Sequence, residues 1–312
     1  MNIAVIGAGI AGLSAARTLT GHGHRVTVFE RAQVPGGRIA TRKITAVELP
    51  RGLSGDVAFD HGAQYFTVRD DRFSEIAAEW ERDKVIAKWT GRIVSFDGDG
   101  WEEVAATTTR YVGTPGMNAI AEWMARGLDI RYGQKIESID PLLAEFNRII
   151  VATPDQPRVA MKPCWTVMAA FEERVAARFD AAFVNGSALG WIARNSSKPK
   201  RNWQIDTWVI HASTAWSEAH RDDRPEDVGA FLMEAFEDLI PPGLPRAFYA
   251  TVHRWKYATA DPPLAIGAIQ ESDSRVTWCG DWCAGSRIED AYLSGLAAAE
   301  LNATTKGAKN AK

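Results

Sequence analysis

Three glycines near the N-terminus have the spacing of a phosphate-binding turn. Gly7, Gly9 and Gly12 form G-x-G-x-x-G between an apolar run and a stretch with helical spacing. The first glycine permits a tight turn, the second admits a pyrophosphate to the backbone, and the third lets helix and strand pack closely. Amides at the helix N-terminus hold the phosphate charge. Glu30, at the end of the next apolar run, can accept both hydroxyls of an adenosine ribose. This combination predicts dinucleotide binding; the alternative is a glycine-rich turn in an ordinary α/β domain.

A second pair of glycines indicates which dinucleotide to expect. Gly36 and Gly37 follow Glu30 after five intervening residues and are followed directly by Arg38. The glycines bring backbone close to phosphate, and the guanidinium adds a charge-assisted donor. This pattern resembles the second fingerprint of the two-dinucleotide-binding-domain flavoproteins, which NAD-dependent dehydrogenases do not carry. FAD is therefore the predicted cofactor. The contacts predicted in this half of the site are Gly7, Ala8, Gly9, Ile10, Ala11, Gly12, Glu30, Arg31, Gly36, Gly37 and Arg38.

A third match lies near the C-terminus. Gly280 and Asp281 end an apolar run, and residues 287–291 open an alanine-rich stretch. The pattern resembles the C-terminal FAD motif of these flavoproteins. The resemblance implies that Asp281 accepts a ribityl hydroxyl. Amides near Ile288, together with the helix dipole, would stabilise negative charge on the flavin during reduction. Ala291 is included among the predicted contacts.

The segment Asp60–Thr67 makes the resemblance more specific. Its pattern D-x-G-A-Q-Y-F-T resembles the motif that renalases place beside the flavin ring. Renalases are FAD-dependent oxidases of dihydronicotinamide dinucleotides. The resemblance implies that Ala63, Gln64 and Tyr65 contact the flavin, and that backbone near Ile136 reads the adenine edge. Bacterial renalase-like proteins share further segments of this chain, at 111–117, 191–199 and 253–258. The chain departs from them after Pro154, where a helix seen in renalases is reduced or missing.

Two further stretches carry side chains suited to a substrate. His253 and Trp255 fall on one face of a predicted strand, so that both can line a planar donor. We interpret His253 either as a partner for a substrate carboxamide or the flavin, or as an ordinary core or surface histidine. Residues 194–201 form a basic segment with Asn195 and Lys198. This segment is either a solvated hairpin loop or a clamp for substrate phosphates or a flavin edge. Gln64, Tyr65, His253 and Trp255 are the candidate catalytic residues.

The sequence shows no pattern typical of a disulfide framework, a metal site or a catalytic triad. Cys164, Cys279 and Cys283 do not make a disulfide framework, and the C-x(3)-C spacing of the last two is not a zinc half-site without a second pair. No Ser-His-Asp arrangement and no metal set is legible. With no cysteine evidently placed to link the flavin, we expect FAD to bind non-covalently.

The elements that must position these residues follow from hydrophobic spacing. Helices are expected to follow Gly9, to cover 71–84 and 225–239, and to start near 116 and 287. A hairpin is expected over 89–104. Strands are expected at 3–6, 25–29, 147–152, 165–171, 182–184, 189–193, 205–212, 248–257 and from 276, with 128–132 and 135–139 paired to each other.

The FAD motifs occur at both ends and near the middle of the chain, so two interleaved domains are predicted. The fold class is α/β: an FAD-binding Rossmann-type (p-hydroxybenzoate hydroxylase-like) domain interleaved with a mixed-sheet α+β substrate domain. The FAD domain would take 1–60, 110–155 and 274–303. The substrate domain would take 61–109 and 156–273, and residues 304–312 would be a flexible tail.

Composition narrows the function. The 312 residues are 46% hydrophobic and 24% charged, with a net charge of −3, which gives no argument for nucleic acid or an anionic membrane. An immediate N-terminal strand leads us to expect no signal peptide and a cytoplasmic protein.

The renalase resemblance implies hydride transfer from 2- and 6-dihydro isomers of NAD(P)H to flavin N5. Reoxidation by O2 would then yield H2O2 and NAD(P)+. A flavin amine oxidase acting on a small amine and a non-catalytic FAD-binding protein are the alternatives, and the sequence does not indicate the oligomeric state.

Overall fold

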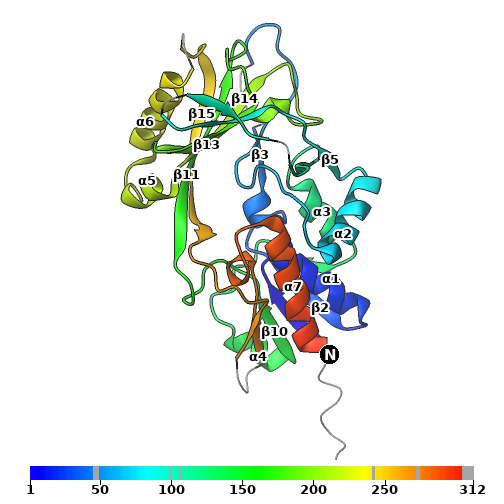
Figure 1. Ribbon diagram of the computed structural model, residues 1–312. Coiled ribbons are helices and arrows are strands. Elements are labelled where there is room, and N and C mark those ends of the chain that lie inside the picture. Colours follow the sequence, from blue (N-terminus) through cyan, green and yellow to red (C-terminus); the bar gives the residue numbers. More distant parts are fainter. Residues whose placement is uncertain (45–48, 99, 106, 241–242, 272–274, 304–312) are drawn as a thin grey trace, which may run out of the picture.

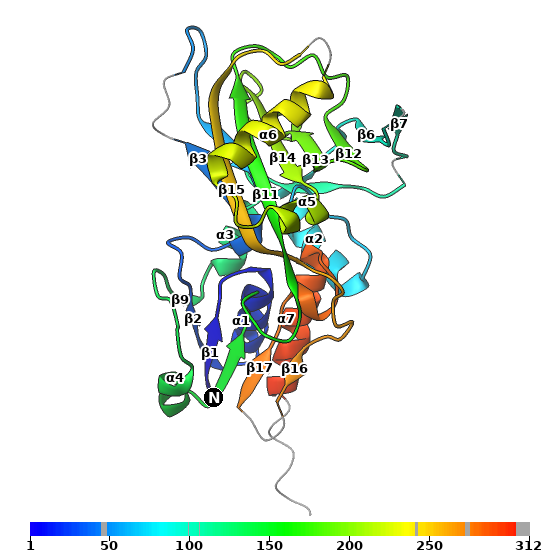
Figure 2. The same ribbon diagram turned by 90° about the vertical axis from the view of Figure 1, so that its left-hand side faces the viewer.

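The computed structural model describes residues 1–44, 49–98, 100–105, 107–240, 243–271 and 275–303. Within these ranges the chain forms two lobes, each built on one large sheet (Figures 1 and 2). The predicted tail, 304–312, lies outside the described residues. Of the helices in the described ranges, none combines the length and the apolar character needed to cross a membrane.

The first lobe contains a sheet built from three separate parts of the chain. Its described strands run in the order β16 (Ile269–Gln270), β17 (Val276–Trp278), β10 (Arg148–Val151), β1 (Asn2–Ile6), β2 (Arg25–Phe29) and β9 (Asp129–Arg131). Every pair is parallel except β16–β17. The central strands are buried runs such as Ile3–Ile6, as expected for a parallel sheet covered on both faces.

Two helices from opposite ends of the sequence pack together in this lobe. Helix α1 (Ile10–Gly21) lies beside α7 (Ile288–Ala303) in both side views (Figures 1 and 2). Gly295 permits the contact, because a Cβ there would lie 2.2 Å from the carbonyl oxygen of Ala11. Helix α3 (Ala119–Ala125) joins the same core, and α4 (Asp140–Glu145) precedes β10.

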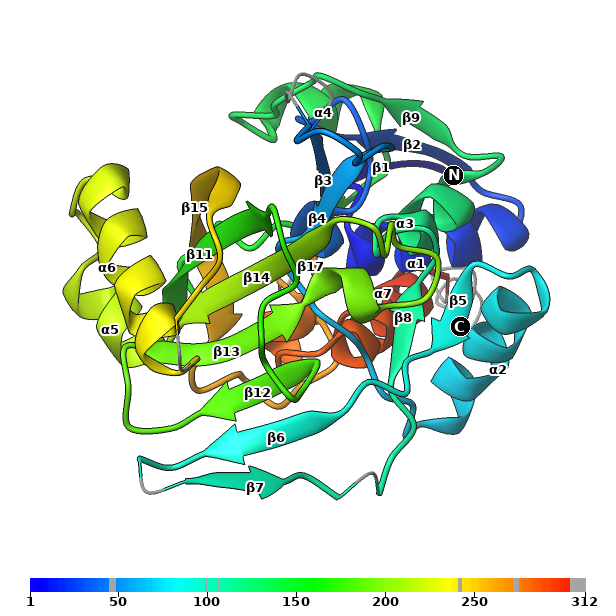
Figure 3. The ribbon, with the colours of Figure 1, turned by 90° about the horizontal axis from the view of Figure 1, so that it is seen from above.

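The second lobe is organised around a mixed sheet. Its described strands run in the order β15 (Ala247–Ala260), β11 (Met161–Phe171), β14 (Asp206–Ala212), β13 (Leu189–Arg194), β12 (Ala181–Val184), β6 (Ile93–Phe96) and β7 (Trp101–Glu103) (Figure 3). The β12–β6 pair is parallel and the other pairs are antiparallel. Helices α5 (Thr214–Ala219) and α6 (Pro225–Asp238) flank this sheet beside β11 and β15.

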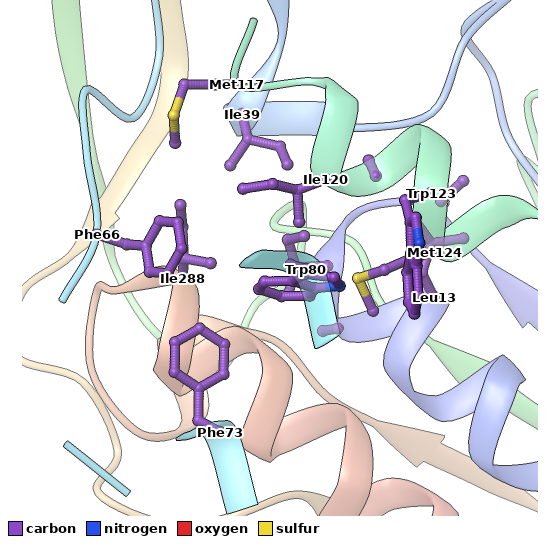
Figure 4. Packing of buried hydrophobic residues seen from close by; sticks show 14 of the residues in the cluster. Leu13, Ile39, Phe66, Phe73, Trp80, Met117, Ile120, Trp123, Met124 and Ile288 are labelled. Atoms are coloured by element: carbon purple, nitrogen blue, oxygen red, sulfur yellow. The ribbon is translucent and has the colours of Figure 1, made fainter. Parts of the chain in front are cut away.

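Several smaller elements lie where the lobes meet. Strand β3 (Thr41–Ile44) pairs with β4 (Val57–Asp60), and β5 (Ile86–Lys88) pairs with β8 (Tyr111–Gly113). Helix α2 (Asp71–Arg82) packs on α7; Figure 4 shows Phe66, Phe73 and Ile288 gathered in this core. Short 3-10 turns are η1 (Gly37–Ile39), η2 (Asn195–Ser197) and η3 (Asp281–Cys283).

The α/β class, the Rossmann-type lobe and the mixed sheet are confirmed. The pairing of 128–132 with 135–139 is wrong: β9 pairs in parallel with β2, and residues 135–139 form no strand. The apolar side chains Ile136 and Ile139 pack instead against the cluster around Phe29 and Ile149. The segment after Pro154 contains no helix in residues 155–160, as expected.

Candidate cofactor groove and active site

The first glycine turn folds back against its own helix. Gly7 donates its N–H to the carbonyl of Phe29 (2.8 Å) and has φ of 105°. A Cβ on Gly12 would lie 2.0 Å from the carbonyl oxygen of Gly7, so only glycine fits there. Around Gly9, by contrast, a Cβ would meet no atom within 4 Å. The turn therefore presents bare backbone to open space at the N-terminus of α1, which suits a pyrophosphate.

The second glycine pair lies against the first turn. A Cβ on Gly37 would be 3.8 Å from the Cα of Gly9, and Gly36 donates its N–H to the carbonyl of Ala8 (2.9 Å). Both glycines have positive φ, which favours residues without a side chain. Two glycine stretches about 30 residues apart in the sequence thus form one side-chain-free backbone surface, which we call the candidate cofactor groove.

Glu30 lies against the first glycine turn. It is 8% exposed, and its carboxylate accepts hydrogen bonds from Ala8 N (2.7 Å) and Ala32 N (2.8 Å). Each carboxylate oxygen retains a further lone pair for a ribose hydroxyl. Arg31 is exposed, and Ile136 is half-buried in the neighbouring apolar cluster.

Glu30→Ala is expected to weaken FAD binding by about one to two decades in Kd. Hydrogen bonds to a charged acceptor contribute about 1.5–3 kcal/mol, which corresponds to that range. The measurement is a titration of the apoprotein with FAD, followed by flavin fluorescence. Glu30→Gln, which keeps one acceptor oxygen, is the matched control, and its Kd for FAD should lie between those of the wild type and Glu30→Ala. Equal affinity in all three proteins would remove Glu30 from the site.

The predicted phosphate donor and ribityl acceptor pair with each other in the structure. Arg38 donates to both carboxylate oxygens of Asp281, at 2.8 and 2.5 Å, and also to the carbonyl of Ala258 (3.0 Å). Asp281 belongs to η3 and Arg38 to η1, so this ion pair joins the second and third FAD motifs. The bond to Ala258 also connects this pair to β15 of the second lobe.

The turn at residues 60–64 contacts the second glycine motif on one hand and the second lobe on the other. We call this region, where the two lobes meet, the junction. Ala63 donates its N–H to the carbonyl of Arg38 (2.9 Å). A Cβ on Gly62 would lie 2.0 Å from that same oxygen, which explains the small residues of the motif. Gln64 is 7% exposed; its amide nitrogen donates to the carbonyls of Asp60 and Gly62, and its amide oxygen accepts from Lys198 Nζ (3.1 Å).

A cluster of buried charges supports this turn from behind. Asp60, which is fully buried, accepts from Lys198 Nζ (3.2 Å) and Arg201 Nη2 (2.6 Å), and its other oxygen accepts from Thr41 Oγ1 and Met117 N. Burial alone would raise the pKa of Asp60, but Lys198 and Arg201 lower it to about 2. Burial lowers the pKa of Lys198 to about 8 despite the attraction of Asp60, and the like charge of Arg201 adds to that lowering. We name Asp60, Lys198 and Arg201 the buried charge cluster.

The solvated-loop interpretation of 194–201 is wrong. Arg194, Asn195, Lys198 and Arg201 are each at most 9% exposed. Arg194 pairs with Asp206 (2.7 Å), and Asn195 donates to the carbonyl of Ala58 (2.9 Å). The sequence shows the cations but not their buried acidic partners, which come from β4 and β14. Asp60 and Arg201 are functional candidates that the sequence analysis did not single out.

Two of the four predicted catalytic residues, His253 and Trp255 on β15, contact the 60–64 turn at His61. Their ring centroids lie 5.0 and 4.9 Å from that of His61. Trp255 Nε1 also donates to the carbonyl of His61 (2.9 Å). Burial, His253 and Arg42 lower the pKa of His61 to about 4, and burial with Arg42 lowers the pKa of His253. Both imidazoles are therefore neutral near pH 7.

Tyr65 faces a different set of rings. It lies 5.6 Å from Trp191 and 6.2 Å from Trp89, measured between ring centroids. The Arg110 guanidinium lies 5.5 Å over the Tyr65 ring, and Lys198 Nζ lies 5.7 Å over Trp89. Aromatic faces at the junction thus already contact cations of the protein itself.

The start of α7 also reaches the junction. Ile288 is buried against the first-lobe core, whereas Ala291 is half-buried. Glu289 is 3% exposed and accepts from the amides of Arg69 (2.7 Å) and Asp70 (2.9 Å). Gly280 donates its N–H to Ser294 Oγ (2.9 Å), which ties η3 to the helix. The third motif therefore lies at the same junction as the second.

Comparison with known proteins accords with this geometry. A model of the NAD(P)-binding Rossmann-like domain matches residues 5–80, and a model of the flavin containing amine oxidoreductases matches residues 184–301. A putative protoporphyrinogen oxidase from Exiguobacterium sp. 255-15 superposes with a TM-score of 0.75 over 98% of this chain and 99% of that one, at 9% identity. The two family models support a flavin-dependent oxidoreductase related to the flavin containing amine oxidoreductases, and the solved structure shares this chain's fold. They also support FAD as its cofactor, and the glycine groove and Glu30 fit that group.

Another solved structure shares the fold, and two further proteins match short segments of this chain. A putrescine oxidase double mutant, redesigned for cofactor binding, superposes with a TM-score of 0.65 over 97% of this chain and 99% of that one, at 12% identity. An L-amino-acid oxidase from Daboia russelii is 52% identical over 42 residues, which are 14% of this chain. A phytoene dehydrogenase from Streptomyces griseus is 41% identical over 81 residues, or 26% of this chain. The matched segments span only 8% and 14% of these two relatives, respectively.

Two of the three cysteines lie in the interior of the protein. Cys279 and Cys283 are buried, and burial raises the pKa of both thiols, that of Cys283 to about 11. Across the ranges that the structure describes, no group of three or more His, Cys, Asp or Glu side chains could hold a metal ion.

Proposed function

We propose that this flavin-dependent oxidoreductase is an oxidase of dihydronicotinamide dinucleotides, with the 2- and 6-dihydro isomers of NAD(P)H as donors. Non-covalently bound FAD would accept the hydride at N5 and pass two electrons to O2, giving H2O2 and NAD(P)+. The protein's own contribution is to place the donor ring against the cofactor in a reactive orientation. Oxidase-type structural neighbours support O2 and a small molecule as co-substrates.

One observation carries the choice of donor: the buried carboxylates identified at the junction all have partners. Asp60 is held by Lys198 and Arg201, and Asp281 by Arg38. Glu289 accepts from two backbone amides. An amine must lose a proton before or during oxidation and gains from an anion near its ammonium group, whereas a dihydropyridine requires only placement. The arrangement therefore favours a neutral ring as hydride donor.

The aromatic rings support the same choice. An aromatic cage for an amine needs ring faces open to a substrate cation. Arg110 lies over Tyr65 and Lys198 lies over Trp89, so a second cation there would meet like charge. A neutral His253, beside Trp255, can instead exchange hydrogen bonds with a carboxamide.

Anaerobic single-turnover reduction tests this function. We expect the 2- and 6-dihydro isomers to bleach the flavin at least about 100-fold faster than NADH or putrescine, a difference of about 3 kcal/mol in barrier. NADH is the matched control, because it differs from the isomers only in the position of the transferred hydrogen. Fast reduction by the amine and none by the isomers would establish the amine-oxidase alternative. Reduction by neither class would favour the non-catalytic one.

His253→Ala is expected to slow reduction by the favoured isomer about tenfold or more while FAD stays bound. The loss of one hydrogen bond to the donor, about 1 kcal/mol or more, together with a vacated ring contact at Trp255, accounts for that size. The readouts are the limiting reduction rate and the flavin-to-protein ratio. His22→Ala, at an exposed position beyond α1, is the control. An unchanged rate would remove His253 from the site.

A further inference from the structure

The buried charge cluster is not neutral. It holds one carboxylate, Asp60, and two cations, Lys198 and Arg201, which are 0%, 2% and 9% exposed. Lys198 donates to Asp60 and Gln64, and the other acceptors of Arg201 are the carbonyls of Gly113 (2.8 Å) and Pro199 (2.9 Å). These further acceptors are uncharged. One positive charge is therefore left uncompensated within the cluster, in a place that solvent and salt cannot screen well.

This excess charge lies directly behind the turn that closes the cofactor groove. Lys198 Nζ contacts the amide oxygen of Gln64, and the amide nitrogen of Gln64 donates to Gly62. On its other side the same turn contacts Arg38 of the second glycine motif, through the Ala63 N–H. A single turn of backbone therefore separates Lys198 from Arg38 of the second glycine motif.

We propose that Lys198 is a positioning residue that acts as a fixed cation behind the flavin, and that its charge, carried through the Gln64 turn, stabilises the flavin when it gains negative charge. The ammonium group touches neither cofactor nor donor; it holds the Gln64 amide and sets the electrostatic potential of the junction. The inference rests on FAD binding at this groove and not on the proposed donor.

Arg201 alone cannot replace this contribution. It makes the shorter contact with Asp60, so those two charges largely cancel. The remaining cation is then Lys198, whose pKa of about 8 keeps it mostly protonated at pH 7. Because Asp60 keeps Arg201 as a partner when Lys198 is replaced, neutral variants at this position leave no buried carboxylate without a cation.

Sulfite is a probe that reports this potential without any donor. It adds to flavin N5 and leaves negative charge on the N1–O2 side of the ring, and the bleaching of the flavin gives its Kd. The variants are Lys198→Gln, which keeps polar contacts without charge, Lys198→Met, which removes both, and Lys198→Arg, which keeps the charge. Lys162→Met is the matched control, since Lys162 forms a half-exposed pair with Glu218 in the same lobe.

We expect the sulfite Kd of the holoprotein to rise about tenfold or more in Lys198→Gln and Lys198→Met. In Lys198→Arg and Lys162→Met it should stay within about threefold of the wild type. A wild-type Kd in Lys198→Gln would overturn the proposal. An equal loss in Lys198→Arg and Lys198→Gln would also overturn it, because packing rather than charge would then be the cause. If Lys198→Met fails to fold, the sulfite Kd values of Lys198→Gln and Lys198→Arg still test the proposal. None of these outcomes depends on which donor reduces the flavin.

Discussion

Gly12→Ala is expected to destabilise the apoprotein by about 3 kcal/mol and to abolish FAD binding. The new Cβ would lie 2.0 Å from the carbonyl oxygen of Gly7 and 3.2 Å from the Cβ of Ala152. Neither the backbone of the turn nor the start of α1 can move away without disturbing β1 and β10. Overpacking of this kind typically costs 1–3 kcal/mol, and the contact here is with backbone rather than with a side chain that can turn aside. Urea unfolding of the apoprotein and FAD titration measure the two effects.

Gly21→Ala is the control on the same helix. A Cβ at Gly21, the last residue of α1, meets no atom within 4 Å, so the change should be neutral or stabilising by up to about 1 kcal/mol. Gly9→Ala distinguishes an effect on folding from an effect on cofactor binding. Its Cβ would enter open space, so the unfolding free energy should stay that of the wild type while the affinity for FAD falls. Wild-type stability in Gly12→Ala would contradict the close packing of helix on turn.

Asp60→Ala is expected to cost about 3–5 kcal/mol of unfolding free energy. The change leaves Lys198 and Arg201 buried without their carboxylate, and removing one partner from a buried ion pair has that effect. It also removes the acceptor for Thr41 Oγ1 and Met117 N. Chemical unfolding at pH 7 is the measurement. Asp227→Ala, which breaks an exposed pair with Arg224, is the control and should leave the unfolding free energy close to that of the wild type.

The pH dependence of the same variant gives a second check. The pKa of Asp60 is about 2 in the folded protein, below its ordinary value, so its contribution is present above about pH 4 and is lost as the pH falls towards 2. The wild type should therefore lose about 2 kcal/mol more stability than Asp60→Ala over that interval. If the unfolding free energies of the two proteins fell equally between pH 4 and pH 2, Asp60 would not be held ionised by the buried charge cluster.

The glycine turns of the candidate cofactor site could be predicted from the sequence because their determinants are local. Gly7, Gly9 and Gly12 are dictated by a turn that closes within a few residues, and the paired glycines before Arg38 need only positive φ and a missing Cβ. Apolar spacing likewise predicted strands such as β2 and β14 to within a residue or two. One exception is 135–139, expected as a strand, whose two isoleucines pack beside Phe29 from irregular chain.

The substrate half depends on partners that are far apart in the sequence. The basic segment 194–201 looks solvated until Asp60, more than 130 residues earlier, is brought beneath it. Arg38 and Asp281 were each predicted to hold FAD, and the structure also makes them partners of each other.

By itself the sequence determined the dinucleotide turn, the choice of FAD and the interleaving of two lobes, because glycine geometry and hydrophobic period act over short stretches of chain. Only the tertiary structure decided which charges are buried and paired, that His253 and Trp255 contact His61 while Tyr65 faces Trp89 and Trp191, and that one cation stays uncompensated behind Gln64. The physical reason is that the burial of a charge is decided by residues that other elements bring to it, and no local spacing in the chain encodes those distances.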